Sequence, residues 1–259
     1  MNVFLHIGDA RTGSSTLQAL LFHNRARLAA EGVDYPVLGT REGKGVAHHK
    51  LPFSLLPQWP VHSPIAPVAA DDIWGAMRDH LDRSEARVTV LSSEAFLNLS
   101  EASVAYVKEA LRGHEVTPIC VRRDPEDWRR SWRAHRIRQG EVVSPPKQPA
   151  RDLAGPKMAR WGAAFDLVTL PYSKTVLGDV VAAMGLDLAK LETAHARNQS
   201  CSDAVLERLN VLNAMALSEA NRAALCVVLG DASGVLKGVN LDDLDRAAFN
   251  QRVIDFLAR

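Results

Sequence analysis

The amino-acid sequence predicts an α/β protein: a three-layer sandwich with a central, mainly parallel sheet of four to five strands and a helical C-terminal part. Two observations lead to this fold class. Short apolar segments alternate with amphipathic segments of helical period, and the apolar segments are hydrophobic throughout instead of alternating with polar residues. Strands that are buried on both faces have this pattern, and the helices that cross over between them supply the covering layers.

The order of the elements follows from the same patterns and from capping and breaking residues. We expect strands at residues 3–7, 33–36, 87–92, 116–121 and 166–170. We expect helices at about 14–30, 71–85, 100–112, 126–139, 157–165, 176–184, 202–214, 218–229 and 241–258. Ser100 is suited to cap the helix that it opens. Pro118 indicates a late or edge position for its strand, since proline cannot donate a backbone hydrogen bond.

The segment 37–70 interrupts this alternation. It contains five prolines and three glycines, so that only a short helix near 49–56 is expected within it. Long irregular insertions in compact domains are usually functional or disordered, and Phe53 and Trp59 favour a packed segment here. We expect a single domain over 1–259, with this irregular insertion forming a wall or lid on the substrate side.

Composition excludes several classes of protein. The chain has 259 residues, 47% of them hydrophobic and 24% charged, with a formal net charge of +1. Its three cysteines are too widely spaced for a disulfide framework or a zinc site. It has no apolar run long enough to span a membrane and no signal peptide, so we expect a cytoplasmic protein.

The stretch after the first predicted strand has the composition of a phosphate-binding loop. Gly8 and Gly13 bracket a tight turn, and hydroxyl residues open the next helix at 14–16. Such a loop directs backbone N–H groups toward an anion, and the helix N-terminus adds partial positive charge. Ser14 stands where the pattern G-x-x-x-x-G-K-[ST] has its lysine, so the cation of this loop is Arg11.

This loop resembles the 5′-phosphosulfate loop of sulfotransferases that use PAPS (3′-phosphoadenosine-5′-phosphosulfate) as donor. The residues that carry the resemblance are Arg11, Thr12, Gly13, Ser14, Ser15 and Thr16. The family usually has lysine or arginine here, then a small residue, glycine and two or three hydroxyl residues. The resemblance implies that these six residues bind the 5′ end of PAPS.

A second motif matches the same family. Arg123 follows the predicted strand 116–121, and Ser131 lies eight residues later in the next predicted helix. A guanidinium fork and a hydroxyl suit a phosphate monoester. The spacing resembles the family's 3′-phosphate signature, which implies that Arg123 and Ser131 bind the 3′-phosphate of PAPS. Lys237 is a candidate for the further basic residue that often closes on that phosphate.

The resemblance covers most of the chain, except 37–70 and roughly the last forty residues. Further segments that resemble bacterial sulfotransferases are 28–36, 90–94, 166–186 and 198–200. The family resemblance implies transfer of a sulfuryl group from PAPS to a hydroxyl or amine of a small-molecule, glycan or lipid acceptor. Arg11 would meet the charge that develops on the leaving oxygen, and no metal is required for this.

A hydroxyl acceptor must lose its proton, so the site needs a general base. Glu94 directly follows the predicted strand 87–92, and we expect it at the same sheet edge as Arg11 and Arg123. The family uses a glutamate here in some members and a histidine in others. Glu94 is therefore the predicted base, with His48 and His49 of the insertion as its rivals.

Three other functions compete with this one. Seven arginines lie within 122–138, but Asp124, Glu126 and Asp127 are interleaved with them and the net charge is near zero, so we expect no nucleic-acid partner. A P-loop-type kinase or NTPase should have lysine after Gly13, which is absent. A non-catalytic nucleotide-binding member of the same fold remains open.

Overall fold

The computed structural model describes residues 1–41, 45–61, 63–193 and 202–257 of the chain. The chain divides into two compact units. The first consists of Met1–Pro125 and Arg151–Asn198, and the second of Glu126–Ala150 and Gln199–Arg259. This division into compact units does not test the expectation of a single sulfotransferase-like domain over 1–259, which stays a prediction.

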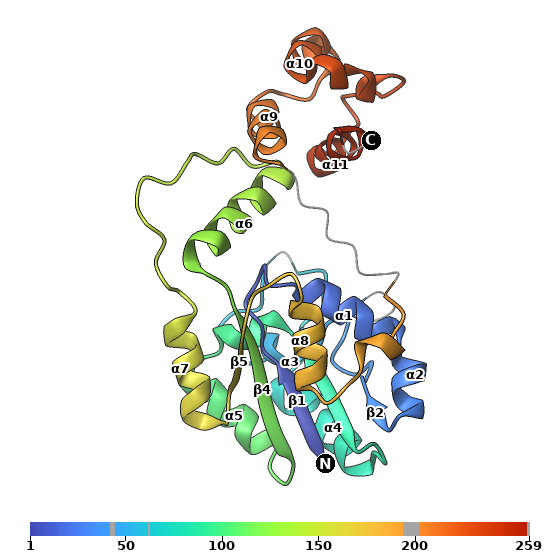
Figure 1. Ribbon diagram of the computed structural model, residues 1–259, viewed down its shortest axis with the longest axis vertical. Helices are drawn as coiled ribbons and strands as arrows, with labels where there is room; N and C mark the ends of the chain where they lie inside the picture. Colours follow the sequence, from blue (N-terminus) through green and yellow to red (C-terminus); the bar gives the residue numbers. More distant parts are fainter. Residues whose placement is uncertain (42–44, 62, 194–201, 258–259) are drawn as a thin grey trace. The chain divides into compact units, whose positions relative to one another are not determined.

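The first unit is built on a five-stranded sheet whose neighbouring strands are all parallel, in the order β2-β3-β1-β4-β5 (Figure 1). The strands are β1 (Asn2–His6), β2 (Val33–Asp34), β3 (Val88–Ser92), β4 (Glu115–Arg122) and β5 (Val168–Pro171). In the register of the sheet, Leu5 of the central strand β1 pairs with Leu91 of β3 and with Pro118 of β4. The predicted α/β class with a parallel sheet is thereby confirmed.

Helices cover both faces of this sheet. The helices of the unit are α1 (Ser14–His23), α2 (Arg25–Ala30), α3 (Lys50–Phe53), α4 (Ala70–Arg83), α5 (Glu101–Ala110), α7 (Gly155–Ala164) and α8 (Val176–Ala183). One buried cluster joins Leu5, Leu91 and Cys120 to side chains of α4, α5 and α7. A second cluster joins Val90 and Ile119 to side chains of α1, α2 and α8. Successive strand residues therefore enter opposite cores, as both-sided burial requires.

Local chemistry explains where several elements begin and end. Ser100 caps α5 as predicted, because its hydroxyl accepts from the Ser103 N–H. The single helix expected over 14–30 is divided at Asn24 into α1 and α2. The Asn24 amide donates to the carbonyls of Leu20 and Glu192, and its oxygen accepts from the Glu192 N–H. This side chain stabilises the break between the helices by binding a distant loop.

Pro118 indicated a late or edge position for its strand. The strand β4 is late, as the fourth of five along the chain, but the edge position is wrong, because β4 lies between β1 and β5. The carbonyl of Ile119 accepts from Ile7 on the β1 side, so the backbone of the preceding Pro118 faces the β5 side. Pairing with β5 starts only at Ile119. The missing N–H of the proline thus falls where β5 has not yet begun, and the inner position costs no sheet hydrogen bond.

The second unit is helical. It contains most of α6 (Pro125–Arg138) together with α9 (Asp203–Asn213), α10 (Arg222–Leu229) and α11 (Arg246–Leu257). Its buried core includes Ile137, Leu209, Leu225 and Phe249. The helix expected from residue 241 begins only at Arg246, where the Asp245 carboxylate accepts from the Ala248 N–H. Among the described residues, no helix is long and apolar enough to cross a membrane.

Candidate functional site

The polar residues singled out in the sequence follow the carboxyl ends of neighbouring strands. Arg11 lies in the loop after β1, Glu94 begins the 3₁₀ helix Glu94–Asn98 after β3, and Arg123 follows β4. Because all five strands are parallel, these ends lie at one edge of the sheet, which is where α/β folds bind ligands. Strand order places the β1 loop between the other two segments.

The loop after β1 has an unusual backbone. Gly8, Arg11 and Gly13 all adopt positive φ, with values of 49°, 69° and 93°. Arg11 is the one non-glycine residue with positive φ among the described residues, and such a conformation is strained for a residue with a Cβ. The carbonyl of Asp9 accepts from the hydroxyls of Thr12 at 2.6 Å and Ser14 at 3.3 Å. These bonds hold the loop in a closed turn.

The helix α1 begins directly at this loop. Gly13 is its N-cap and, as a glycine, makes no side-chain cap hydrogen bond. The Thr16 N–H donates back to the Gly13 carbonyl, whereas the N–H groups of Ser14 and Ser15 precede the first intrahelical bonds. A helix start of this kind can donate hydrogen bonds to an anion and attracts it through the helix dipole.

The arginine after β4 contacts this loop. Arg123 donates from Nη1 to the carbonyl of Arg11 at 2.8 Å, and its guanidinium lies over the ring of Tyr172 at 4.2 Å from the centroid. The ring of Tyr172 and the carbonyl of Arg11 therefore both fix the position of the Arg123 guanidinium. Ser131, the expected partner of Arg123, lies on α6 in the second unit. Lys237 also belongs to the second unit. The segment 198–200 lies outside the described residues.

A cavity of about 320 Å³ lies beside the loop. Its lining residues all belong to the first unit: His6, Thr12, Gly13, Thr16, Leu17, Val121, Tyr172, Ser173, Lys174, Val176, Leu177 and Val180. Polar and cationic groups thus come from the loop and from the end of β5, and aliphatic groups come from α8. Lys174 and Tyr172 were not anticipated from sequence. The sequence feature that could have indicated them is the polar segment Tyr-Ser-Lys-Thr, which only Pro171 separates from the last predicted strand.

Glu94 is held by a residue that the sequence patterns did not single out. The buried Gln18 of α1 donates from Nε2 to Glu94 Oε2 at 2.9 Å. The other carboxylate oxygen, Oε1, lies 4.0 Å from His49 Nε2, and both side chains are partly exposed. The signal for Gln18 is an amide among leucines on a helix that must pack against the sheet. A buried amide of this kind needs a polar partner.

The two adjacent histidines of the insertion have different environments. His48 is fully buried, with Nε2 bonded to the Pro36 carbonyl at 2.8 Å and Nδ1 accepting from the Ser92 N–H at 3.0 Å. Burial lowers the pKa of His48 to about 4. His49 is partly exposed, bonds Ser93 Oγ through Nδ1 at 2.7 Å, and stacks on Phe53. Both ring nitrogens of His48 are engaged, so we expect a structural role for it and leave His49 as the rival to Glu94.

A third histidine lies beneath the loop. His6, the last residue of β1, is buried and bonds Ser92 Oγ through Nδ1 at 2.8 Å. Burial lowers the pKa of His6 to about 4, against the opposing effect of the Glu94 charge. This neutral ring lies close enough to Gly8 that a Cβ on that glycine would be 3.1 Å from His6 Cε1.

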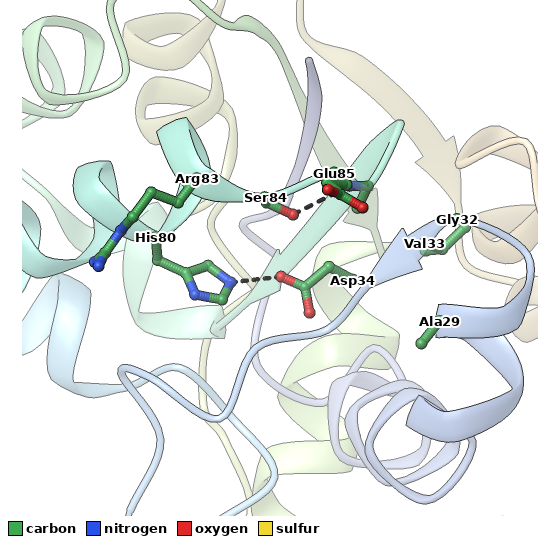
Figure 2. Close-up of a pocket in the computed structure, with 9 residues that line it drawn as sticks. Ala29, Gly32, Val33, Asp34, His80, Arg83, Ser84 and Glu85 are labelled. Carbon is green, nitrogen blue, oxygen red and sulfur yellow. Dashed lines mark hydrogen bonds and ion pairs between the residues drawn. The ribbon is translucent and has the colours of Figure 1, made fainter.

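A second, larger hollow of about 760 Å³ lies elsewhere in the first unit (Figure 2). Gly32 and the segment 84–86 belong to its lining and precede β2 and β3, so it lies at the amino ends of these strands. Figure 2 shows His80 and Asp34 pointing toward one another, and their 2.6 Å bond joins α4 to β2. The end of α4 in this hollow is a helix C-terminus, whose partial negative charge is unfavourable for a phosphate.

The loop geometry predicts that Gly8→Ala destabilises the protein. The positive φ and a Cβ placed 3.0 Å from Ser14 Oγ should lower the free energy of unfolding by about 1–2 kcal/mol. As a control, Gly162→Ala changes an exposed glycine of α7 with open space around it and should raise stability by ~0.5–1 kcal/mol. Urea denaturation measures both, and equal effects of the two variants would contradict the proposed strain.

Stability should also fall in mild acid. The pKa of His48 is about 4 in the folded chain against 6.5 for the free group, so the unfolded chain binds more protons in this window. The contribution of neutral His48 to the free energy of unfolding is therefore fully present above pH 6.5 and is lost as the pH falls toward 4. His48→Asn should reduce the slope of stability against pH there by ~1.4 kcal/mol per unit.

Denaturation series across this pH range measure the slope for His48→Asn. Leu51→Ala serves as the control, because it removes a buried side chain that does not titrate and should lower stability without changing the slope. Parallel curves for wild type and His48→Asn would show that His48 is not a buried neutral group.

Comparison with known proteins identifies no relative of this chain. No family model, no curated protein and no solved structure matches it. Function must therefore be inferred from the residues of the site, their contacts and the motifs of the sequence.

Proposed function

We propose that the protein is a sulfotransferase that moves a sulfuryl group from PAPS to a hydroxyl or amine of a small-molecule, glycan or lipid acceptor. The observation that carries the proposal is a cavity whose lining includes Thr12, Gly13 and Thr16 of the motif loop. Tyr172, which also lines this cavity, lies under the guanidinium of Arg123, and Arg123 in turn binds the Arg11 carbonyl. The loop of the first motif and the arginine of the second motif are thus joined by a hydrogen bond, which supports a shared role in binding one ligand.

The residues present suit a donor with phosphate at both ends of its ribose. The start of α1, whose N-cap is Gly13, offers backbone N–H groups, and Lys174 adds a cation to the lining of the cavity. The cavity volume of about 320 Å³ lies at the lower end of the range for ligand pockets, about 300–1,000 Å³. By the resemblance, Arg123 and Ser131 would hold the 3′-phosphate and the segment 11–16 the 5′ end.

The chemistry required of the chain is then limited. PAPS, when bound, supplies a sulfuryl group attached to a phosphate leaving group. Arg11 provides positive charge beside the leaving oxygen, where electrostatic stabilisation lowers the barrier. Glu94 accepts the proton of the acceptor, held in place by Gln18. As part of this proposal, the enzyme acts in the cytoplasm, binds no nucleic acid and requires no metal.

The first test is nucleotide binding. Wild type should bind 3′,5′-ADP, the spent donor, much more tightly than 5′-AMP, and Arg123→Met should lose ~1.5–3 kcal/mol of affinity for 3′,5′-ADP alone. Thermal-shift titrations measure both affinities, because stabilisation depends on ligand concentration over Kd. The control is Arg122→Met, which removes the neighbouring exposed arginine paired with Asp152.

Equal affinity of wild type for 3′,5′-ADP and 5′-AMP would contradict the sulfotransferase assignment. Preference for ATP with Mg²⁺ would favour the kinase or NTPase alternative. Binding of 3′,5′-ADP without turnover of PAPS would favour a non-catalytic member of the fold.

The second test concerns the base. Glu94→Gln keeps the size of the side chain but cannot take a proton, so it should bind 3′,5′-ADP normally and lose roughly 10²–10⁴-fold in rate. The rate is measured as formation of 3′,5′-ADP from PAPS with a mixture of phenols, alcohols and amines as acceptors. Near-normal turnover in Glu94→Gln, together with collapse in His49→Phe, would move the base to His49.

A further inference from the structure

Glu94 and His49 face each other across a gap that a direct hydrogen bond does not close. The distance from Glu94 Oε1 to His49 Nε2 is 4.0 Å, beyond hydrogen-bond range. The second carboxylate oxygen is occupied by Gln18, and the His49 ring is fixed by stacking on Phe53 with an interplanar angle of 6°. Both side chains keep part of their surface exposed, 26% for His49 and 30% for Glu94.

The contacts of Ser93 determine which nitrogen of His49 carries the proton. Ser93 is fully buried, and its Oγ accepts from the Ala95 N–H. Within the described residues, the acceptor that its own O–H can reach is Nδ1 of His49, at 2.7 Å. A buried hydroxyl without an acceptor would be costly, so Ser93 donates to Nδ1. Neutral His49 then carries its proton on Nε2, directed at the gap.

The gap is consequently lined by one donor and one acceptor. His49 contributes an N–H, and Glu94 Oε1 contributes a carboxylate oxygen. An oxygen atom about 2.8 Å from each of them would satisfy both groups at once. The charged or titratable groups that sense Glu94 are His6, Tyr35 and His49, and burial favours the neutral form of each.

We propose that Glu94, His49 and Ser93 form a binding notch that selects a hydroxyl, and not an amine, as the acceptor group; this rests on the proposed sulfotransferase function. A hydroxyl oxygen has two lone pairs, so one can accept from His49 Nε2–H while the other attacks sulfur. Its O–H proton is directed at Glu94 Oε1. A neutral amine has a single lone pair, which the bond to His49 would withdraw from attack.

The transfer balances with these groups. The acceptor oxygen forms a bond to the sulfur of PAPS, and the bond from sulfur to the bridging phosphate oxygen breaks with its electron pair on that oxygen. The proton of the hydroxyl passes to Glu94. His49 keeps its proton throughout and acts as a positioning residue for the acceptor oxygen, with Ser93 setting its tautomer.

The tautomer of His49 can be measured without any substrate. In protein labelled with ¹⁵N-histidine, the ring shifts at pH 7.5 should show a protonated Nε2 and an unprotonated Nδ1 for His49. The signal is assigned by its loss in His49→Phe, which keeps a stacked ring. A protonated Nδ1 in wild type would overturn the proposal, since Nε2 could not then donate to an acceptor oxygen.

Two serine variants provide a matched pair. Ser93→Ala removes the donor to Nδ1 and should move the His49 population measurably toward the Nδ1–H form. Ser92→Ala removes the hydroxyl bonded to His6 and should change the His6 signal, leaving that of His49 as in wild type. Identical His49 signals in wild type and Ser93→Ala would also contradict the assignment.

Matched acceptors separate this inference from the proposed function. With PAPS as donor, hydroxyl compounds should be sulfated at least tenfold faster than the corresponding amines, as in 2-naphthol against 2-naphthylamine and aliphatic alcohols against aliphatic amines. Equal or faster transfer to amines would overturn hydroxyl selection. Failure to bind 3′,5′-ADP would instead count against the sulfotransferase function, while the tautomer measurement still decides the geometry of the notch.

Discussion

Burial of a parallel sheet on both faces is the constraint on which the rest of the first unit depends. Because helices cover both sides, β3 is buried at all five of its residues and β1 at most of its positions. Exposed polar side chains at this end of the sheet must then follow the strands instead of lying within them. Arg11, Glu94 and Arg123 are placed at one sheet edge for this reason, although they are far apart in the chain.

A network of buried polar groups supports this edge from below. Ser92, at the end of β3, bonds His6 of β1 through its hydroxyl and His48 of the insertion through its N–H. Tyr35 packs edge-on against His48 and donates to the Val46 carbonyl, so the insertion is tied to the sheet at several points. Satisfied networks of this kind define one arrangement, because each unpaired member would be costly. The segment that carries His49 is therefore positioned by its neighbours.

Sequence patterns were sufficient for the fold class and for the residues that follow the strands, but they did not predict three particular features of the structure. Gln18 is one polar residue on an apolar helix face, and its pairing with Glu94 depends on how α1 packs against the end of β3. The burial of His48 beside the partly exposed His49 depends on the path of an irregular insertion without a period to interpret. The inner position of β4 depends on where β5 begins, which local propensity around Pro118 does not encode.

The sequence by itself determined the alternation of strands and helices, the glycine-bearing loop before α1 and the identity of the charged residues at the strand ends. These features follow from local causes, namely hydrophobic period, capping and backbone freedom at glycine. Only the tertiary structure decided that Arg123 binds the Arg11 carbonyl, that Gln18 holds one oxygen of Glu94 and that the other oxygen faces His49. Each of these contacts joins residues distant in the chain, and their geometry is set by sheet order and helix packing, which no local pattern specifies.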